Sequence, residues 1–307
     1  MGKSTREAYG EALRELGALN DKLVVLDADL SGSTKTSTFR KAFPDRFFNF
    51  GIAEANMVCA AAGLAFSGYL PFASTFAMFG TGRAFEQVRN SVAHCRANVK
   101  LACTHAGLSV GEDGATHQCL EDVALMRELP DMTVLVPCDA AETRKAVLAA
   151  AELDGPVYLR LSRPNTDDIT DADSPFVPGR ANILREGADA AIFANGLMVA
   201  PALRAADLLE REGVRTAVVN FHTVKPLDRE TVLAFHTKVR AIVTAEEHFV
   251  SGGLGSAVAE VLAGQPGARF ARVGVEDRFG QSGRPDELFA LYGLTAENIA
   301  GRLKALL

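Results

Sequence analysis

The sequence has no excess of basic residues and no long apolar run, and each absence argues against a class of protein. The formal net charge is -6 at pH 7, whereas nucleic-acid binding depends on clustered lysine and arginine. No apolar stretch approaches the ~18 residues of a membrane span, and the N-terminus is typical of an amphipathic helix, not of a signal peptide. We therefore expect a cytoplasmic protein that binds neither nucleic acid nor membranes.

Cysteine is also scarce, with five residues in 307. The number is odd, and the cysteines form neither C-x-x-C pairs nor a close Cys/His ligand pattern, so neither a disulfide framework nor a zinc site is expected. Reduced thiols fit the cytoplasm best. The cysteines are Cys59, Cys95, Cys103, Cys119 and Cys138.

The chain is long enough for two hydrophobic cores. Apolar strands alternate with helical patterns, which predicts parallel sheets covered by helices on both faces. A polar, proline-rich stretch interrupts this alternation and reads as a linker. We expect an α/β protein with two doubly wound domains and mainly parallel sheets, divided into 1–162, a linker at 163–181, and 182–307. The helices expected in the first domain are 4–19, 52–67, 78–96, 120–128 and 139–152.

A single carboxylate, Glu54, stands at the start of the small-residue helix in "GIAEANMVCAAAGLAFSG". A glutamate in the first turn is commonly stabilised by the helix dipole alone. The alanines and glycines that follow also suit a helix packed closely against another helix or chain. A carboxylate buried at such a seam should need a protonatable partner.

Three phenylalanines, Phe72, Phe76 and Phe79, cluster in "PFASTFAMF", where a strand gives way to a helix. Core packing is the ordinary explanation for such a cluster. Phe76 and Phe79 lie three residues apart, however, and can share one face that brackets a flat ring. Together with Glu54, this pattern indicates a site for a heteroaromatic cofactor.

A glycine-rich loop follows the strand that ends near residue 104. Glycines at 107, 111 and 114 free its backbone, and ionisable side chains crowd into it. The loop is either a solvated surface segment or part of a site, because ligands of doubly wound sheets bind at the carboxyl ends of the strands. The ionisable residues are His105, Glu112, Asp113 and His117.

Four motifs, "NFGIAEANM", "PFASTFAMF", "GEDGATHQ" and "LSRPN", occur in this order. Together they resemble the C-terminal half of transketolase, which comprises a pyrimidine-binding domain and a C-terminal domain. The resemblance implies thiamin diphosphate as the cofactor. It also implies that Glu54 hydrogen-bonds N1' of the aminopyrimidine and so promotes loss of the C2 proton of the thiazolium.

The same resemblance implies further roles. Phe76 and Phe79 match the rings that hold the aminopyrimidine, while a third aromatic expected one turn later is replaced by Gly82. Asp113 and His117 match a pair near the sugar hydroxyls, and His117 joins Glu54 as a catalytic residue. The positions that match phosphate-holding residues are Arg6, Ser33, His105 and Arg163.

The "GDG" motif that serves the diphosphate and the metal ion in this family is absent from the sequence. We therefore expect no metal ligands in this chain, and expect a partner subunit to hold Mg²⁺ or Ca²⁺ through oxygen ligands. Met1 followed by a helix bearing Arg6 favours a natural split subunit over a fragment. The expected assembly is a heterotetramer with an N-terminal transketolase subunit, two copies of each.

The resemblance implies transfer of a two-carbon ketol unit between sugar phosphates, active only with the partner. The segment "VTAEEHFVSGGLGS" also resembles deoxyxylulose-phosphate synthase and the beta subunit of 2-oxo-acid dehydrogenases, which remain alternatives. A non-catalytic regulatory subunit of the same fold is another. A Rossmann dehydrogenase is disfavoured, because "SGGLGS" lacks the full G-x-G-x-x-G spacing after a first strand.

Overall fold

The computed structural model describes residues 2–307, and its first helix shows how local sequence sets an element boundary. Ser4 caps α1 (Thr5–Leu19): its hydroxyl accepts a hydrogen bond from the Glu7 amide, and the Glu7 carboxylate accepts one from the Ser4 amide. This reciprocal pair satisfies two amides that a helix start leaves free. Tyr9 and Leu13 on its buried face then pack against the first sheet.

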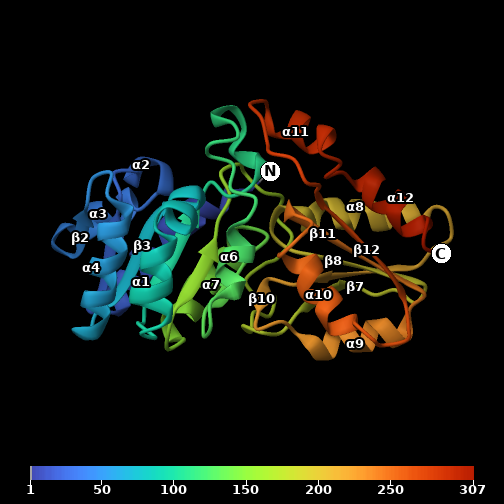
Figure 1. Ribbon diagram of the computed structural model, residues 1–307, viewed down its shortest axis with the longest axis horizontal. Helices are drawn as coiled ribbons and strands as arrows, with labels where there is room; N and C mark the ends of the chain where they lie inside the picture. Colours follow the sequence, from blue (N-terminus) through green and yellow to red (C-terminus); the bar gives the residue numbers. More distant parts are fainter. Residues whose placement is uncertain (1) are drawn as a thin grey trace.

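The first sheet runs in the order β10-β5-β6-β4-β3-β1-β2. All neighbouring strands in it are parallel except β10, which pairs antiparallel with β5. Figure 1 shows this sheet and its helices as one domain, blue to green, beside a second domain in yellow to red. The strands are β1 (Leu23–Asp27), β2 (Phe47–Asn49), β3 (Leu70–Phe76), β4 (Lys100–Thr104), β5 (Thr133–Leu135), β6 (Val157–Arg160) and β10 (Thr223–Lys225).

Helices cover both faces of this sheet. One face packs against α1, α3 and α7, and the other against α4, α6 and the segment after β3. The helices besides α1 are α2 (Ser31–Thr34), α3 (Ser37–Ala42), α4 (Glu54–Phe66), α5 (Phe85–Gln87), α6 (Asp122–Glu128) and α7 (Ala140–Glu152). Short 3-10 turns are η1 (Pro44–Arg46) and η4 (Leu108–Asp113), and π-helical turns are η2 (Met78–Arg83) and η3 (Val88–Ala93).

The prediction of one continuous helix over 78–96 is wrong. The segment divides into η2, α5 and η3, with wide i to i+5 hydrogen bonds such as the one from the Ala84 amide to the Phe79 carbonyl (3.1 Å). Gly80 and Gly82 weaken the regular helix here, because glycine has a low helix propensity. Such π-turns are frequent at functional sites, and η2 begins just after Phe76 and contains Phe79, the predicted aromatic pair.

The second domain has a five-stranded sheet in the order β12-β11-β8-β9-β7, parallel except at β7. Helices α8, α11 and α12 cover one face, and α9 and α10 cover the other. The strands are β7 (Asn182–Arg185), β8 (Ala190–Ala194), β9 (Thr216–Asn220), β11 (Ala241–Phe249) and β12 (Arg269–Val275). The helical elements are η5 (Gly196–Met198), α8 (Val199–Glu210), α9 (Arg229–Lys238), α10 (Leu254–Leu262), α11 (Pro285–Leu291) and α12 (Ala296–Lys304).

The predicted fold class is therefore confirmed: both domains are α/β with mostly parallel sheets. Within residues 2–307, no helix has the length and apolar character that crossing a membrane requires. The segment predicted as a linker is hydrogen-bonded to the start of α7. The Asp139 carboxylate there accepts hydrogen bonds from the amides of Ile169 and Thr170 and from the Thr170 hydroxyl.

A buried polar network joins the two domains. Arg160 on β6 donates to the Asp122 carboxylate (2.7 Å) and to the backbone carbonyl of Glu247 on β11 (2.8 Å). The Glu247 carboxylate accepts from the Ser109 amide (2.6 Å) and packs against Gly107, where a Cβ would lie 2.3 Å from its carboxyl carbon. The glycine at 107, with φ of 81°, therefore permits this contact as well as the backbone turn.

Glu247 predicts a pH dependence of stability. Burial raises the pKa of its carboxyl from 4.5 to about 7. Between these values the unfolded chain loses a proton that the folded chain keeps, so the contribution of Glu247 to stability falls as the pH rises through this window. Glu247→Gln should raise the free energy of unfolding by ~1–3 kcal/mol at about pH 8 and by less at about pH 5. Urea unfolding at both pH values measures the free energy of unfolding, and an equal increase at both would contradict the prediction. Glu152→Gln, at an exposed position, is the control.

Candidate active site at the carboxyl edge of the first sheet

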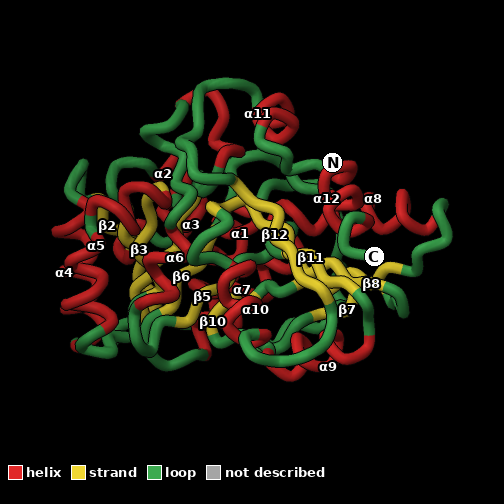
Figure 2. Tube along the Cα trace, turned by 45° about the vertical axis from the view of Figure 1, so that its right-hand side comes forward, coloured by secondary structure: helices red, strands yellow, loops and turns green. Residues whose placement is uncertain are grey.

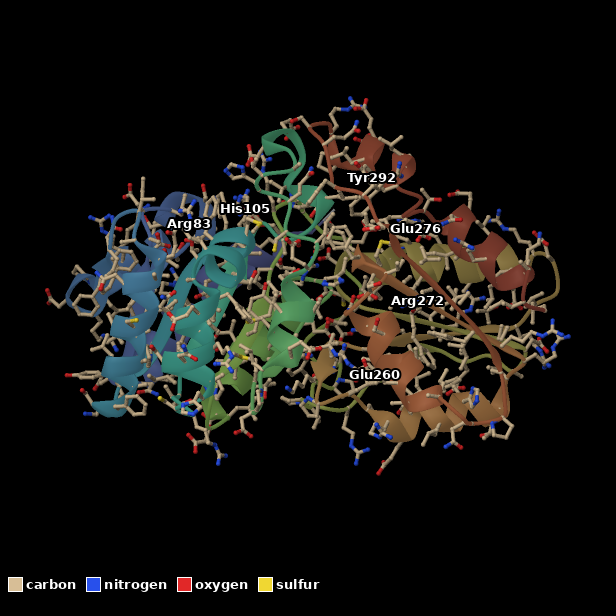
Figure 3. The ribbon with its side chains drawn as sticks, in the orientation of Figure 1. Arg83, His105, Glu260, Arg272, Glu276 and Tyr292 are labelled. Carbon is tan, nitrogen blue, oxygen red and sulfur yellow. The ribbon has the colours of Figure 1, made fainter. Side chains whose placement is uncertain are left out.

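The parallel sheet gathers the predicted site residues at one edge. Strands β6, β4, β3 and β1 are neighbours, and the segments after their carboxyl ends meet there. The residues come from separate segments, most of which follow these strands, and Figure 3 labels two residues from this region, Arg83 and His105. Those that follow these strands are Arg163 after β6, His105 after β4, Phe76 and Phe79 at and after the end of β3, and Ser33 after β1.

An aromatic cluster forms the centre of the site. The rings of Phe76 and Phe79 are stacked, with centroids 5.7 Å apart and planes 17° from parallel. His105 stacks on Phe76 at 3.8 Å, and His117 meets Phe79 edge-on at 5.4 Å. The structure thus brings together two predicted cofactor residues and two predicted substrate residues.

Glu54 begins α4 with its carboxylate 2% exposed, and a side-chain cation offsets its charge. Arg83 Nη1 lies 3.1 Å from both carboxylate oxygens. The guanidinium carbon also lies 4.5 Å from the centre of the Phe79 ring, a cation-π contact. Glu54 and Phe79 are therefore joined through Arg83.

Sequence reasoning missed Arg83. At Gly82, where the family resemblance places a third aromatic, a Cβ would lie 2.3 Å from the Met78 methyl carbon. Met78 therefore fills the space beside Gly82. Arg83 lies one residue further on, and its side chain covers Phe79 instead. The available signal was the need of a buried carboxylate for a cation, together with the four-residue spacing from Phe79 to Arg83.

His105 is held neutral. Burial and the nearby charge of Arg6 and Arg163 lower the pKa of its imidazole to about 3. Nδ1 lies 2.8 Å from the Thr104 hydroxyl and Nε2 lies 3.5 Å from Arg6 Nη1, and because arginine has no acceptor, Nε2 accepts from Arg6. Its φ of 58° is unusual for a non-glycine residue and is typical of functional sites.

The predicted phosphate-holding residues also converge. Arg6 donates to the backbone carbonyls of Ser33 (3.0 Å) and Arg163 (3.1 Å). Burial, then the charge of Arg163, lowers the pKa of the Arg6 guanidinium. Arg163 itself donates to the Val110 carbonyl and to the Glu112 carboxylate. Two arginines and a neutral histidine therefore form a local basic pocket on an acidic chain.

Asp113 and His117 lie in the glycine-rich segment beside this cluster. The glycines at 107, 111 and 114 have φ of 81°, 82° and 77°, as the backbone argument predicts. Asp113 ends η4 and is exposed, while His117 is half-buried with Nδ1 3.0 Å from the Thr116 hydroxyl. The roles of both residues near a sugar remain predictions.

The arrangement suits a flat, nitrogen-containing ring. It offers an aromatic face, a buried carboxylate that can exchange a proton with a ring nitrogen, and an adjoining basic cluster at the same edge. Within the described chain, no group of three His, Cys, Asp or Glu side chains is placed to hold a metal ion.

Comparison with known proteins gives consistent matches over the whole chain. Residues 1–168 match the family model for the transketolase pyrimidine-binding domain, and residues 179–299 match that for the transketolase C-terminal domain. A Methanocaldococcus jannaschii protein assigned as a transketolase C-terminal section is 47% identical, over 98% of this chain and 95% of its own length. Human transketolase is 40% identical over 99% of this chain but only 49% of its own length.

A solved structure is also closely similar. It is a split gene transketolase in the form of an inactive beta4 tetramer, with a TM-score of 0.93 and 54% identity over 99% of this chain and 98% of that one. The chain thus spans nearly the full length of separate C-terminal sections and about half of an undivided transketolase.

The state of His105 is open to direct measurement. Since its pKa is lowered to about 3, its imidazole should stay neutral from about pH 5 to 8 in long-range ¹H–¹⁵N NMR spectra. Arg6→Met removes one of the charges that lower this pKa and should raise it, while burial, the largest cause, keeps it below 6.5. A spectrum of His105→Asn assigns the signal. Titration of that signal between pH 6 and 7 in the unmodified chain would contradict the prediction.

Proposed function

Because this chain belongs to the transketolase family and corresponds to its pyrimidine-binding and C-terminal domains, we propose that it is the C-terminal subunit of a split transketolase. In this proposal it transfers a two-carbon ketol unit between sugar phosphates. The observation that carries the proposal is the buried Glu54 carboxylate beside the Phe76–Phe79 stack, with the basic pocket of Arg6, His105 and Arg163 on the same edge.

The cofactor of this proposal is thiamin diphosphate. When bound, it supplies the carbanion-stabilising chemistry of the reaction. Phe76 and Phe79 would hold the aminopyrimidine, and Glu54 would hold a proton at N1'. Mg²⁺ or Ca²⁺, with the diphosphate, would bind to residues of the partner subunit.

The substrate would lie between the aromatic cluster and the basic pocket. Arg6 and Arg163 present planar donors that suit a phosphate. Nε2 of neutral His105 accepts from Arg6 in this structure, so His105 would donate to the phosphate only after its proton moves from Nδ1 to Nε2. Ser33 is adjacent to Arg6, and its backbone carbonyl fixes the guanidinium. Asp113 and His117 would face the sugar hydroxyls. His117, which lies against the Phe79 ring, would exchange protons with those hydroxyls.

An N-terminal partner subunit is part of the proposal. The solved relative, a split gene transketolase, forms an inactive beta4 tetramer, which supports the idea that this section needs a second subunit for activity. Large apolar side chains are exposed at both ends of α4, notably Ile52 (79%) and Phe66 (64%), and these would be covered in an assembly. We propose a cytoplasmic heterotetramer with two copies of each subunit.

Reconstitution tests this function. The isolated chain should be folded and inactive with thiamin diphosphate and Mg²⁺, and ketol transfer should appear on addition of an N-terminal subunit that carries "GDG". In the active complex, Glu54→Gln should lower turnover by ~10²–10⁴, because it removes the acid-base function at N1' while keeping the size of the side chain.

Size-exclusion chromatography of the Glu54→Gln complex serves as the control for assembly. Activity of the isolated chain would contradict the partner requirement. Near-normal turnover of the assembled variant would contradict the role of Glu54. A wild-type complex that assembles and binds the cofactor but transfers no ketol unit would favour the alternative of a non-catalytic regulatory subunit.

Substrate anchoring gives a separate prediction. Arg163→Met should lower kcat/KM for phosphorylated sugars by a factor equivalent to ~1.5–3 kcal/mol, the scale of a hydrogen bond to a charged group. Unphosphorylated analogues should lose much less, because they lack the group that the guanidinium binds. Arg14→Met, on the exposed side of α1, removes the same charge away from the site and is the matched control. Equal losses for both substrate types would show that Arg163 does not bind phosphate.

A further inference from the structure

The guanidinium of Arg83 contacts the two groups to which the proposed function assigns the aminopyrimidine. Nη1 lies 3.1 Å from each oxygen of Glu54, and the guanidinium carbon lies 4.5 Å from the centre of the Phe79 ring. A guanidinium is flat, carries N–H donors in its plane and stacks on aromatic faces. An aminopyrimidine shares these three properties and would use the same carboxylate and the same ring.

The exposure of the two partners shows which of them can move. The Glu54 side chain is 3% exposed, whereas the Arg83 side chain is 52% exposed. Glu54 is fixed at the start of α4, while the half-exposed Arg83 side chain ends the π-turn η2. A ring that approaches Glu54 must therefore replace Arg83, and the arginine has solvent into which it can withdraw.

Charge gives the reason for this arrangement. A buried carboxylate without a partner is strongly unfavourable, so Arg83 stabilises the site when no cofactor is bound. The ion pair with Arg83 needs an ionised Glu54, whereas the bond to N1' needs a proton between the carboxylate and the ring nitrogen. Arg83 Nη1 lies within hydrogen-bond distance of both Glu54 oxygens, so a bond to N1' must replace at least one of these contacts.

We propose that Arg83 is an internal substitute for the aminopyrimidine, which occupies the cofactor-free site and is displaced when thiamin diphosphate binds. This inference rests on the proposed function. The π-turn η2, which ends at Arg83, also carries Phe79, and this places the guanidinium over the Phe79 ring. Arg83 thus sets the affinity for the cofactor by competing with it.

The test compares the wild-type complex, assembled with its N-terminal partner, with the Arg83→Met complex. Methionine keeps an unbranched apolar stem but removes the charge and the donors. An internal competitor weakens apparent binding by the fraction of molecules in which it occupies the site, so Arg83→Met should lower the Kd for thiamin diphosphate by ~3–10-fold in calorimetric titrations at fixed Mg²⁺. Arg89→Met is the matched control, because Arg89 is exposed and its side chain donates to Asn90. The Kd of the Arg89→Met complex for thiamin diphosphate should equal that of the wild-type complex.

A Kd that is unchanged in Arg83→Met would overturn the inference, because Arg83 would then have no effect on cofactor binding. A higher Kd would also overturn it, because Arg83 would then contact the bound cofactor. Absence of cofactor binding by the wild-type complex is a different result, since it would contradict the proposed function itself.

A second measurement needs no cofactor. In the free chain, Arg83→Met should lower Tm by about 2–4 °C, because it leaves the Glu54 carboxylate unpaired. In a Glu54→Gln background the same substitution should lower Tm much less, because a neutral amide needs no counter-charge. Equal losses in the two backgrounds would show that the pair does not stabilise the empty site, and would overturn the inference.

Discussion

The parallel direction of four neighbouring strands is the constraint on which the site depends. β6, β4, β3 and β1 lie side by side in register, so their carboxyl ends form a single edge. At that edge Phe76 on β3 pairs with Thr104 on β4, which places the Phe76 ring directly beside His105, the next residue. A change of direction in any one strand would move its residue to the opposite edge of the sheet, far from the others.

The second domain supports this edge without supplying the reactive groups. Glu247 on β11 fixes the Ser109 amide, and the Gln118 side chain donates to the carbonyl of Gln281, so the glycine-rich loop is held at both ends. α11 lies at the top of the molecule in Figure 1 and in Figure 2, and in Figure 1 the green segment beside it is this loop, which it contacts. The loop thus has the backbone freedom of its glycines but a position set by the neighbouring domain, which keeps His117 against the rings.

Much of the fold follows from short-range sequence patterns. Apolar strands and capped helices gave the alternation correctly, because these signals act within one element. The helix predicted over 78–96 is broken, since a helical pattern does not distinguish a regular turn from a π-turn around Gly80 and Gly82. The short strand β10 was also beyond sequence reasoning: it lies in the second half of the chain yet completes the first sheet through β5, a pairing between distant residues.

For the site, the sequence by itself determined which residue types are present. That a carboxylate, an aromatic pair and a basic set belong to one chemistry is a prediction, which for the basic set rests on the family resemblance. Only the tertiary structure decided their states. Arg83 covers Glu54 and Phe79 because the π-turn η2 places its side chain over both, and His105 is neutral because burial and two arginines act on it together. Charge balance and desolvation depend on distances between residues far apart in the chain, and local sequence patterns do not contain those distances.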